Sequence, residues 1–203
     1  MQTINPYILN DLVKQIEPYV VTDTFVIDEW LSHTGIHESP NNIVLDGNSP
    51  QTMHLGDRWK VGYDETRYFE ADVIVPDYLA GKKVYLSIDF GGEALVRING
   101  EIVGAVSSRE NSGWVHRTEI LFKDKFKGGE KLSIQVEGAV DCASFCNRAI
   151  AGEKQLEYTL KKAELVAVNE KAESYWYDIS TAHEVYECCE DEYIKSRLYI
   201  AID

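Results

Sequence analysis

Apolar and polar residues alternate with a period of two through the middle of the chain, and this alternation restricts the fold more than any other feature. The stretches 69–75, 84–90, 94–98 and 132–136 all show it. A period of two places apolar side chains on one face of an extended strand and polar side chains on the other. The sequence therefore predicts several short strands, each with one face against a core.

Turn residues separate these stretches. Asn99-Gly100 lies between two of them, and this dipeptide is the strongest short signal of a tight hairpin because both residues adopt positive φ. Pro76, Gly91-Gly92 and Gly128-Gly129 mark further ends and turns. Strands and helices do not alternate here, so a doubly wound sheet is excluded. The predicted fold class is mainly β, an antiparallel β-sandwich.

Helical periodicity is confined to the two ends of the chain. Asn5-Pro6 can cap and start a helix, Ile8 and Leu12 continue its apolar stripe, and Glu17-Pro18 ends it. Near the C-terminus, a spacing of four and three residues predicts one helix face, formed by Tyr175, Ile179, Ala182, Tyr186 and Cys189. A second helix is predicted around Ile194, Leu198 and Ala201.

The 203 residues are enough for one domain with appendages. We expect residues 1–50 to form the N-terminal helix and an irregular leader that packs on the sandwich. Residues 51–169 are expected to form the sandwich itself. Residues 170–203 are expected to form a helical linker.

Charge and composition narrow the partners. The net charge of −14 repels phosphate backbones and anionic lipid, so nucleic acid and membrane surfaces are poor partners, whereas a neutral ligand such as a sugar is compatible. Residues 1–10 have neither the basic nor the apolar region of a signal peptide, and no apolar run is long enough to span a membrane. We therefore expect a cytoplasmic protein.

Metal binding is not predicted. The cysteines fall in two close pairs, Cys142 with Cys146 and Cys188 with Cys189, in different predicted elements and without the usual zinc spacing. They are expected to be free thiols in a cytoplasmic chain. A structural calcium near Asp64-Glu65 or Asp124 is left open, with solvated acidic turns as the alternative.

Catalytic motifs are also missing from the sequence. It has no G-x-S-x-G and no phosphate-binding glycine loop, and no acidic pair is singled out for glycoside hydrolysis. We predict no catalytic residue. Candidates for contact with carbohydrate, chosen because aromatic rings pack on sugar rings and polar groups bind hydroxyls, are Trp59, Tyr63, Glu93, Arg109 and Trp114.

Several segments carry a family resemblance. The stretches 55–59, 66–76 and 80–86 resemble the galactose-binding-like jelly rolls of glycoside hydrolases. Residues 89–101, which contain Gly-Gly-Glu-Ala-Leu-Val and Asn-Gly-Glu, resemble the N-terminal β-sandwich of cytosolic-type α-mannosidases of glycoside hydrolase family 38. Residues 162–169 and 175–178 are similar to the segment that joins that sandwich to the catalytic barrel.

This resemblance implies that the chain is the non-catalytic N-terminal domain of a zinc-dependent retaining α-mannosidase. No catalytic residue or zinc ligand carries over, because the sequence has no His-x-His, so zinc is expected only in the catalytic domain. That domain is the expected partner, with carbohydrate and a second copy of the chain as further ones.

Three alternatives remain. One is an autonomous carbohydrate-binding module. The second is the jelly roll of a family 2 β-glycosidase, which shares the generic strand and V-N-G hairpin pattern. The third is an independent enzyme with an acid pair that the sequence does not reveal.

Overall fold

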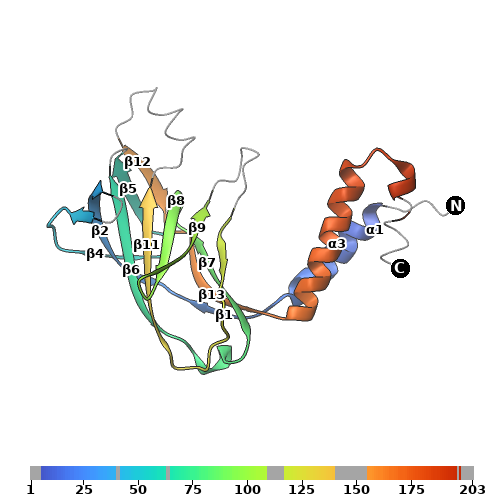
Figure 1. Ribbon diagram of the computed structural model, residues 1–203, viewed down its shortest axis with the longest axis horizontal. Helices are drawn as coiled ribbons and strands as arrows, with labels where there is room; N and C mark the ends of the chain where they lie inside the picture. The colour runs from blue at the N-terminus through green and yellow to red at the C-terminus, as the bar shows by residue number, and fades with distance from the viewer. Residues whose placement is uncertain are drawn as a thin grey trace. The chain divides into compact units, whose positions relative to one another are not determined.

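A computed structural model describes residues 6–39, 42–62, 65–108, 117–139, 155–195 and 197 (Figure 1). The chain divides into two compact units. The larger unit comprises residues 24–166 and contains most of the β-structure. The smaller unit comprises residues 1–23 and 167–203 and contains the helices.

The larger of the two main sheets has the strand order β3-β2-β6-β11-β8-β9, with β4 also paired to β2. Its neighbouring strands are antiparallel throughout. Its strands are β2 (Glu29–Ser39), β3 (Asn42–Leu45), β4 (Gln51–His54), β6 (Thr66–Ile74), β8 (Glu93–Ile98), β9 (Glu101–Ser107) and β11 (Lys131–Ala139).

The second main sheet has four strands in the order β1-β13-β7-β10, and a separate pair is formed by β5 and β12. Its strands are β1 (Val21–Val26), β7 (Lys83–Asp89), β10 (Glu119–Leu121) and β13 (Lys162–Val168), and the pair consists of β5 (Arg58–Gly62) and β12 (Gln155–Thr159). A short 3-10 helix, η2 (Asp77–Leu79), lies between β6 and β7. These elements make the mainly β, antiparallel sandwich that the alternation predicts.

Burial follows the predicted faces in β6, β8 and β11, whereas in β7 the polar residues Ser87 and Asp89 are buried too. In β7, Val84, Leu86 and Ile88 are buried, as are Phe69 in β6 and Val136 in β11. Aromatic rings fill the centre of the core in edge-to-face contacts, with centroids of the Trp30–Phe90, Trp59–Phe69 and Phe69–Phe90 pairs 5.1, 5.2 and 4.8 Å apart. Such pairs stabilise a core beyond the area that they bury.

The predicted Asn-Gly hairpin joins β8 to β9. Asn99 has φ 52° and Gly100 has φ 85°, the left-handed backbone that a two-residue hairpin requires. Asn99 also accepts a hydrogen bond through Oδ1 from the backbone N–H of Ser133 at 2.9 Å. The turn residue therefore helps to hold β8 and β11 in register.

The smaller unit pairs α1 (Pro6–Ile16) with α3 (Glu170–Cys188), and η1 (Glu17–Tyr19) follows α1. Asn169 caps α3, since its side chain accepts hydrogen bonds from the N–H groups of Lys171 and Ala172 at 3.1 and 3.3 Å. Leu9 and Ile179 are buried. The N-terminal helix and the first C-terminal helix are confirmed; residues 192–195 form a helical turn, and residues 198–203 lie outside the described part of the chain.

The structure differs from the sequence interpretation near the N-terminus. β2 and β3 lie within the segment that was expected to be an irregular leader, and the compact β unit starts at residue 24 instead of residue 51. The polar and turn-forming residues of this segment hid its strands, because β2 gains its order from pairing with β6, far along the chain. β10 is short, at Glu119–Leu121, and residues 109–116 are outside the described part.

Candidate functional site

The face of the larger sheet that points away from the core carries a set of polar side chains. In β8, Glu93, Leu95 and Arg97 alternate with core residues, and in β11 Gln135 and Glu137 do the same. The register places Leu95 opposite Glu137 and Arg97 opposite Gln135. The antiparallel pairing therefore collects both charges and an apolar side chain on one patch.

An ion pair lies at the centre of this patch. Arg97 Nη1 is 2.7 Å from Glu137 Oε2, and the two side chains are only 21% and 14% exposed. A charge-assisted bond of this length is among the stronger polar contacts in proteins. It fixes the Glu137 carboxylate in place on the sheet.

Tyr68 of β6 lies directly across from Glu137 on the same face. Burial of the phenol, followed by the nearby negative charge of Glu137, raises the pKa of Tyr68 to about 12. Both causes disfavour the phenolate anion. Tyr68 therefore stays neutral at physiological pH and retains a hydroxyl that can donate and accept hydrogen bonds.

A hollow of about 580 Å³ opens beside this patch, over β8, β9 and β11. This volume lies within the range of small-molecule sites. It has polar groups of both charges and a hydroxyl, together with small and aliphatic side chains; its lining is Glu93, Ala94, Leu95, Ala105, Val106, Ser107, Arg117, Glu137 and Ala139. It is a candidate binding site in the part of the chain that the structure describes.

The sequence candidates are distributed unevenly around the hollow. Glu93 lines it, and its contact with carbohydrate stays a prediction. Tyr63, Arg109 and Trp114 lie outside the described residues. Sequence reasoning did not single out Glu137, Arg97 or Arg117; the alternation in β8 and β11 could have placed the first two on the outer face, but only the strand register brings them together.

Trp59 has a different environment from the one expected of a sugar platform. It is 2% exposed, its ring packs against Phe69 and Tyr158, and Nε1 donates a 2.8 Å hydrogen bond to the carbonyl of Phe90. The correction has a simple physical reason: strand β5 turns this indole into the core, where it has no free face for a ligand.

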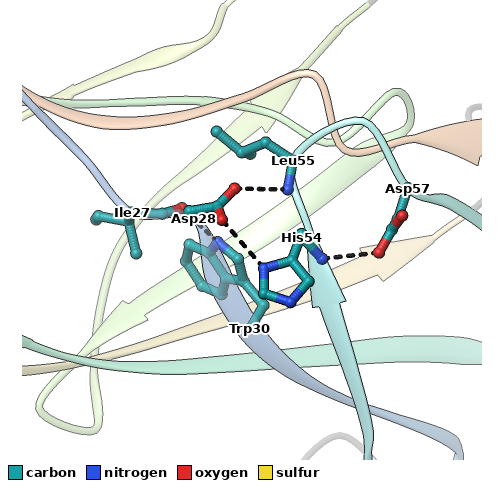
Figure 2. A network of polar contacts seen from close by, with 6 residues as sticks. All are labelled: Ile27, Asp28, Trp30, His54, Leu55 and Asp57. Atoms are coloured by element: carbon teal, nitrogen blue, oxygen red, sulfur yellow. Dashed lines mark hydrogen bonds and ion pairs between the residues drawn. The ribbon is translucent and has the colours of Figure 1, made fainter.

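A second polar network lies at the turn after β4 (Figure 2). The Asp28 carboxylate approaches Nδ1 of His54 at 3.0 Å and accepts a hydrogen bond from the N–H of Leu55 at 3.1 Å, while Asp57 accepts one from the N–H of His54 at 2.8 Å. The side chains of His54 and Asp28 are 51% and 61% exposed. Because most of these bonds go to backbone N–H groups, the network fastens the turn rather than assembling reactive groups.

Possible metal ligands are dispersed in the part of the chain that the structure describes. No group of three or more His, Cys, Asp or Glu side chains there could hold an ion. Cys188 and Cys189 are free thiols, and His183 is 3.9 Å from Glu187. Cys142, Cys146 and Asp64 lie outside the described residues, and Glu65 accepts a hydrogen bond from the N–H of Gly62 at 2.8 Å.

Comparisons with known proteins agree with a jelly roll of the kind found in glycosidases. A family model described as "Alpha-mannosidase, jelly roll domain" matches residues 27–166. The match covers more than half of the chain and most of the β unit. The chain therefore belongs to the family of α-mannosidase jelly-roll domains.

Solved structures with a similar arrangement include two β-glucuronidases. That of Ruminococcus gnavus has a TM-score of 0.49 and 12% identity over 74% of this chain and 30% of its own; that of Faecalibacterium prausnitzii has 0.48 and 13% over 73% and 32%. A β-glucosidase from Kluyveromyces marxianus has 0.37 and 13% over 75% and 17%. The chain spans about a third or less of the length of these enzymes, and a search of curated proteins found no match.

Proposed function

We propose that this chain is the non-catalytic N-terminal domain of a family 38 α-mannosidase, an enzyme that releases terminal α-D-mannosyl residues. The observation that carries the proposal is the family match over residues 27–166. The Gly-Gly-Glu-Ala-Leu-Val segment at 91–96 supports it through its resemblance to α-mannosidases, and three of its residues, Glu93, Ala94 and Leu95, line the hollow.

The chemistry of the described residues supports a non-catalytic role. A glycoside hydrolase needs one carboxyl group that remains protonated to act as general acid. Glu137 is held by the Arg97 guanidinium at 2.7 Å, so its carboxylate is already occupied by a structural ion pair. Asp89 is engaged in a comparable way, since it accepts a hydrogen bond from the N–H of Gly91 at 3.0 Å and lies 3.7 Å from Lys161 Nζ.

In this proposal the zinc ion of the enzyme is bound by the catalytic domain and not by the jelly roll. The described residues do not fit a zinc ion, since none of their His, Cys, Asp and Glu side chains group together as ligands. The metal and the nucleophile would be supplied by the catalytic domain. The jelly roll would pack against that domain and shape the rim of its cleft, and it would share the cytoplasmic location and any oligomeric assembly of the enzyme.

Hydrolysis of an aryl α-mannoside tests the proposal. The 203-residue chain and the same chain extended through its natural continuation are assayed side by side, each with added zinc and with a chelator. Activity that appears only in the extended protein, and only with zinc, is the expected result. Turnover by the 203 residues alone would contradict the non-catalytic role. Absence of hydrolysis by both proteins would contradict the assignment to an α-mannosidase.

A further inference from the structure

We propose that the hollow over β8, β9 and β11 is a binding site for a neutral sugar, with Glu93, Glu137 and Arg117 as hydrogen-bonding groups and Leu95 and Ala105 as its apolar surface. Of the residues that line the hollow, only Glu93 was a carbohydrate candidate from its sequence. The proposal goes beyond the role of a structural domain and does not depend on which enzyme the domain belongs to.

The mixture of charges selects for a neutral ligand. Glu93 and Glu137 present acceptors, and Arg117 presents donors. The carboxylates of Glu93 and Glu137 would repel an anion. The guanidinium of Arg117 would repel a cation, as would that of Arg97, which lies 2.7 Å from Glu137. A hydroxyl group both donates and accepts, so several adjacent hydroxyls can satisfy carboxylate and guanidinium groups at once without a repulsive charge.

The apolar part of the lining fits the carbon face of a pyranose ring. Leu95 and Ala105 lie directly opposite each other on β8 and β9, and Ala139 lies opposite Glu93 on β11. The small side chains of Ala105 and Ala139 and the aliphatic side chain of Leu95 form an apolar surface beside the polar groups. This surface matches a ligand that has C–H groups on one side and hydroxyls at its edge. The volume of about 580 Å³ is large enough for a mono- or disaccharide.

Glu93, Glu137, Leu95 and Ala105 sit on paired strands, and Arg117 is joined to Ser107 of β9 by an isolated bridge. β8 is paired along its length with both β9 and β11, and the Arg97 contact holds Glu137. Groups that strands hold in position lose little conformational freedom when a ligand binds. The hollow is open and shallow, so the expected affinity is weak, with a dissociation constant on the order of 1–10 mM.

The test is a titration of the full 203-residue chain followed by amide NMR shifts. The probes are the neutral methyl glycosides of α-D-mannose, β-D-glucose and β-D-galactose, with glucuronate and glucosamine as charged comparators. We expect saturable shifts from at least one neutral glycoside, centred on Leu95, Ala105 and Ala139, and smaller shifts from both charged sugars. Absence of saturable shifts from every neutral glycoside, or stronger binding of a charged sugar, would overturn the proposal.

Two variants and a control locate the site. Glu93→Gln keeps the size of the side chain but weakens its acceptor, and Ala105→Leu fills the hollow from a solvent-exposed strand position without removing any polar contact. Each is expected to weaken binding by about threefold to tenfold, the value of one hydrogen bond or of a steric block. Glu101→Gln, at the exposed start of β9, is expected to bind like the wild type.

The same spectra report folding, so loss of binding in a variant counts only when its amide shifts elsewhere are unchanged. If both variants bind as tightly as the wild type, the sugar does not occupy this hollow and the proposal fails. The assay of α-mannoside hydrolysis has no part in this readout. Failure of the sugar site and failure of the proposed enzyme family are therefore separate outcomes.

Discussion

The indole Nε1 of Trp59 donates a hydrogen bond of 2.8 Å to the backbone carbonyl of Phe90. Trp59 belongs to β5, and Phe90 directly follows β7 of the four-stranded sheet. Both side chains are almost fully buried, and Phe69 packs edge-on against each of them. This bond links two sheets at the point where Gly91-Gly92 turns the chain into β8, next to the candidate sugar site.

Trp59→Phe should therefore destabilise the sandwich. The replacement keeps a ring in the core but removes the N–H donor, leaves the Phe90 carbonyl unsatisfied and opens a small cavity. We expect the free energy of unfolding to fall by about 2–4 kcal/mol in urea denaturation. Trp176→Phe is the control, because Nε1 of Trp176 has no hydrogen-bond partner in the described structure and its loss should cost clearly less; equal effects would contradict the role given to the bond.

Arg67→Lys should weaken the junction between β2, β4 and β6. The Arg67 guanidinium donates to Ser32 Oγ, Thr34 Oγ1 and Gln51 Oε1 at 2.6, 2.9 and 2.9 Å, and one ammonium cannot reproduce this planar fork. We expect a loss of about 1–3 kcal/mol in the free energy of unfolding, since the buried Ser32 hydroxyl loses its partner.

Arg58→Lys is the matched control for Arg67→Lys. Arg58 is 72% exposed and pairs with Glu157 at 3.2 Å, so the change should stay within about 0.5 kcal/mol. A larger effect at Arg58 than at Arg67 would show that the three neutral acceptors contribute little.

The stability of the sandwich should decrease in alkaline solution through Tyr68. The pKa of Tyr68 is raised from 10.0 to about 12, so the folded protein retains the phenolic proton at a pH where the unfolded chain loses it. The stabilising contribution is complete below pH 10 and disappears as the pH rises toward 12. Because the phenol is partly exposed, we expect a loss of at most about 1 kcal/mol, measured as the difference between wild type and Tyr68→Phe.

Tyrosinate absorbance gives a direct check on the cause of that shift. Glu137→Gln removes the negative charge that contributes to it, so the pKa of Tyr68 should fall part of the way back, since burial remains the larger cause. Glu70→Gln serves as the control, because Glu70 lies on the same strand and the same face of the sheet as Tyr68. A pKa that is unchanged in Glu137→Gln would contradict the electrostatic part of the explanation.

Gly92→Ala should disturb the start of β8. A Cβ at this position would lie 2.5 Å from the carbonyl oxygen of Ala139, which is backbone and cannot move freely. We expect a cost of about 1–3 kcal/mol in the free energy of unfolding, measured in urea. Gly100→Ala has open space around its Cβ and only the strain of φ 85°, so it should cost about 1 kcal/mol or less; the reverse order would contradict the close approach at Gly92.

Much of the local structure could be predicted from the sequence. The alternation in 84–90 correctly placed Val84, Leu86 and Ile88 in the core, although Ser87 and Asp89 on the other face are buried as well, and Asn99-Gly100 correctly placed the β8–β9 turn. Both are properties of neighbouring residues: side chains alternate along any strand, and few residues tolerate positive φ. The resemblance of 89–101 to α-mannosidases is likewise a property of the sequence, and the family match confirms it.

The candidate site could be predicted only in part. Glu93 was singled out beside the Gly-Gly turn, but its neighbours in the hollow come from β9 and β11. Trp59 was expected as a ligand contact because of its residue type, whereas its position in β5 decides that it is buried.

The sequence by itself determined the kind of element at most positions, the turns between them and the family of the domain, because these depend on side-chain periodicity and backbone preference over a few residues. The tertiary structure decided which strands are neighbours: β11 pairs with both β6 and β8, and this register alone places Glu137 between Tyr68 and Leu95, within reach of Arg97. Pairing between strands distant in sequence is selected by packing of the whole core, so the polar patch and its hollow exist only once the sheet is assembled.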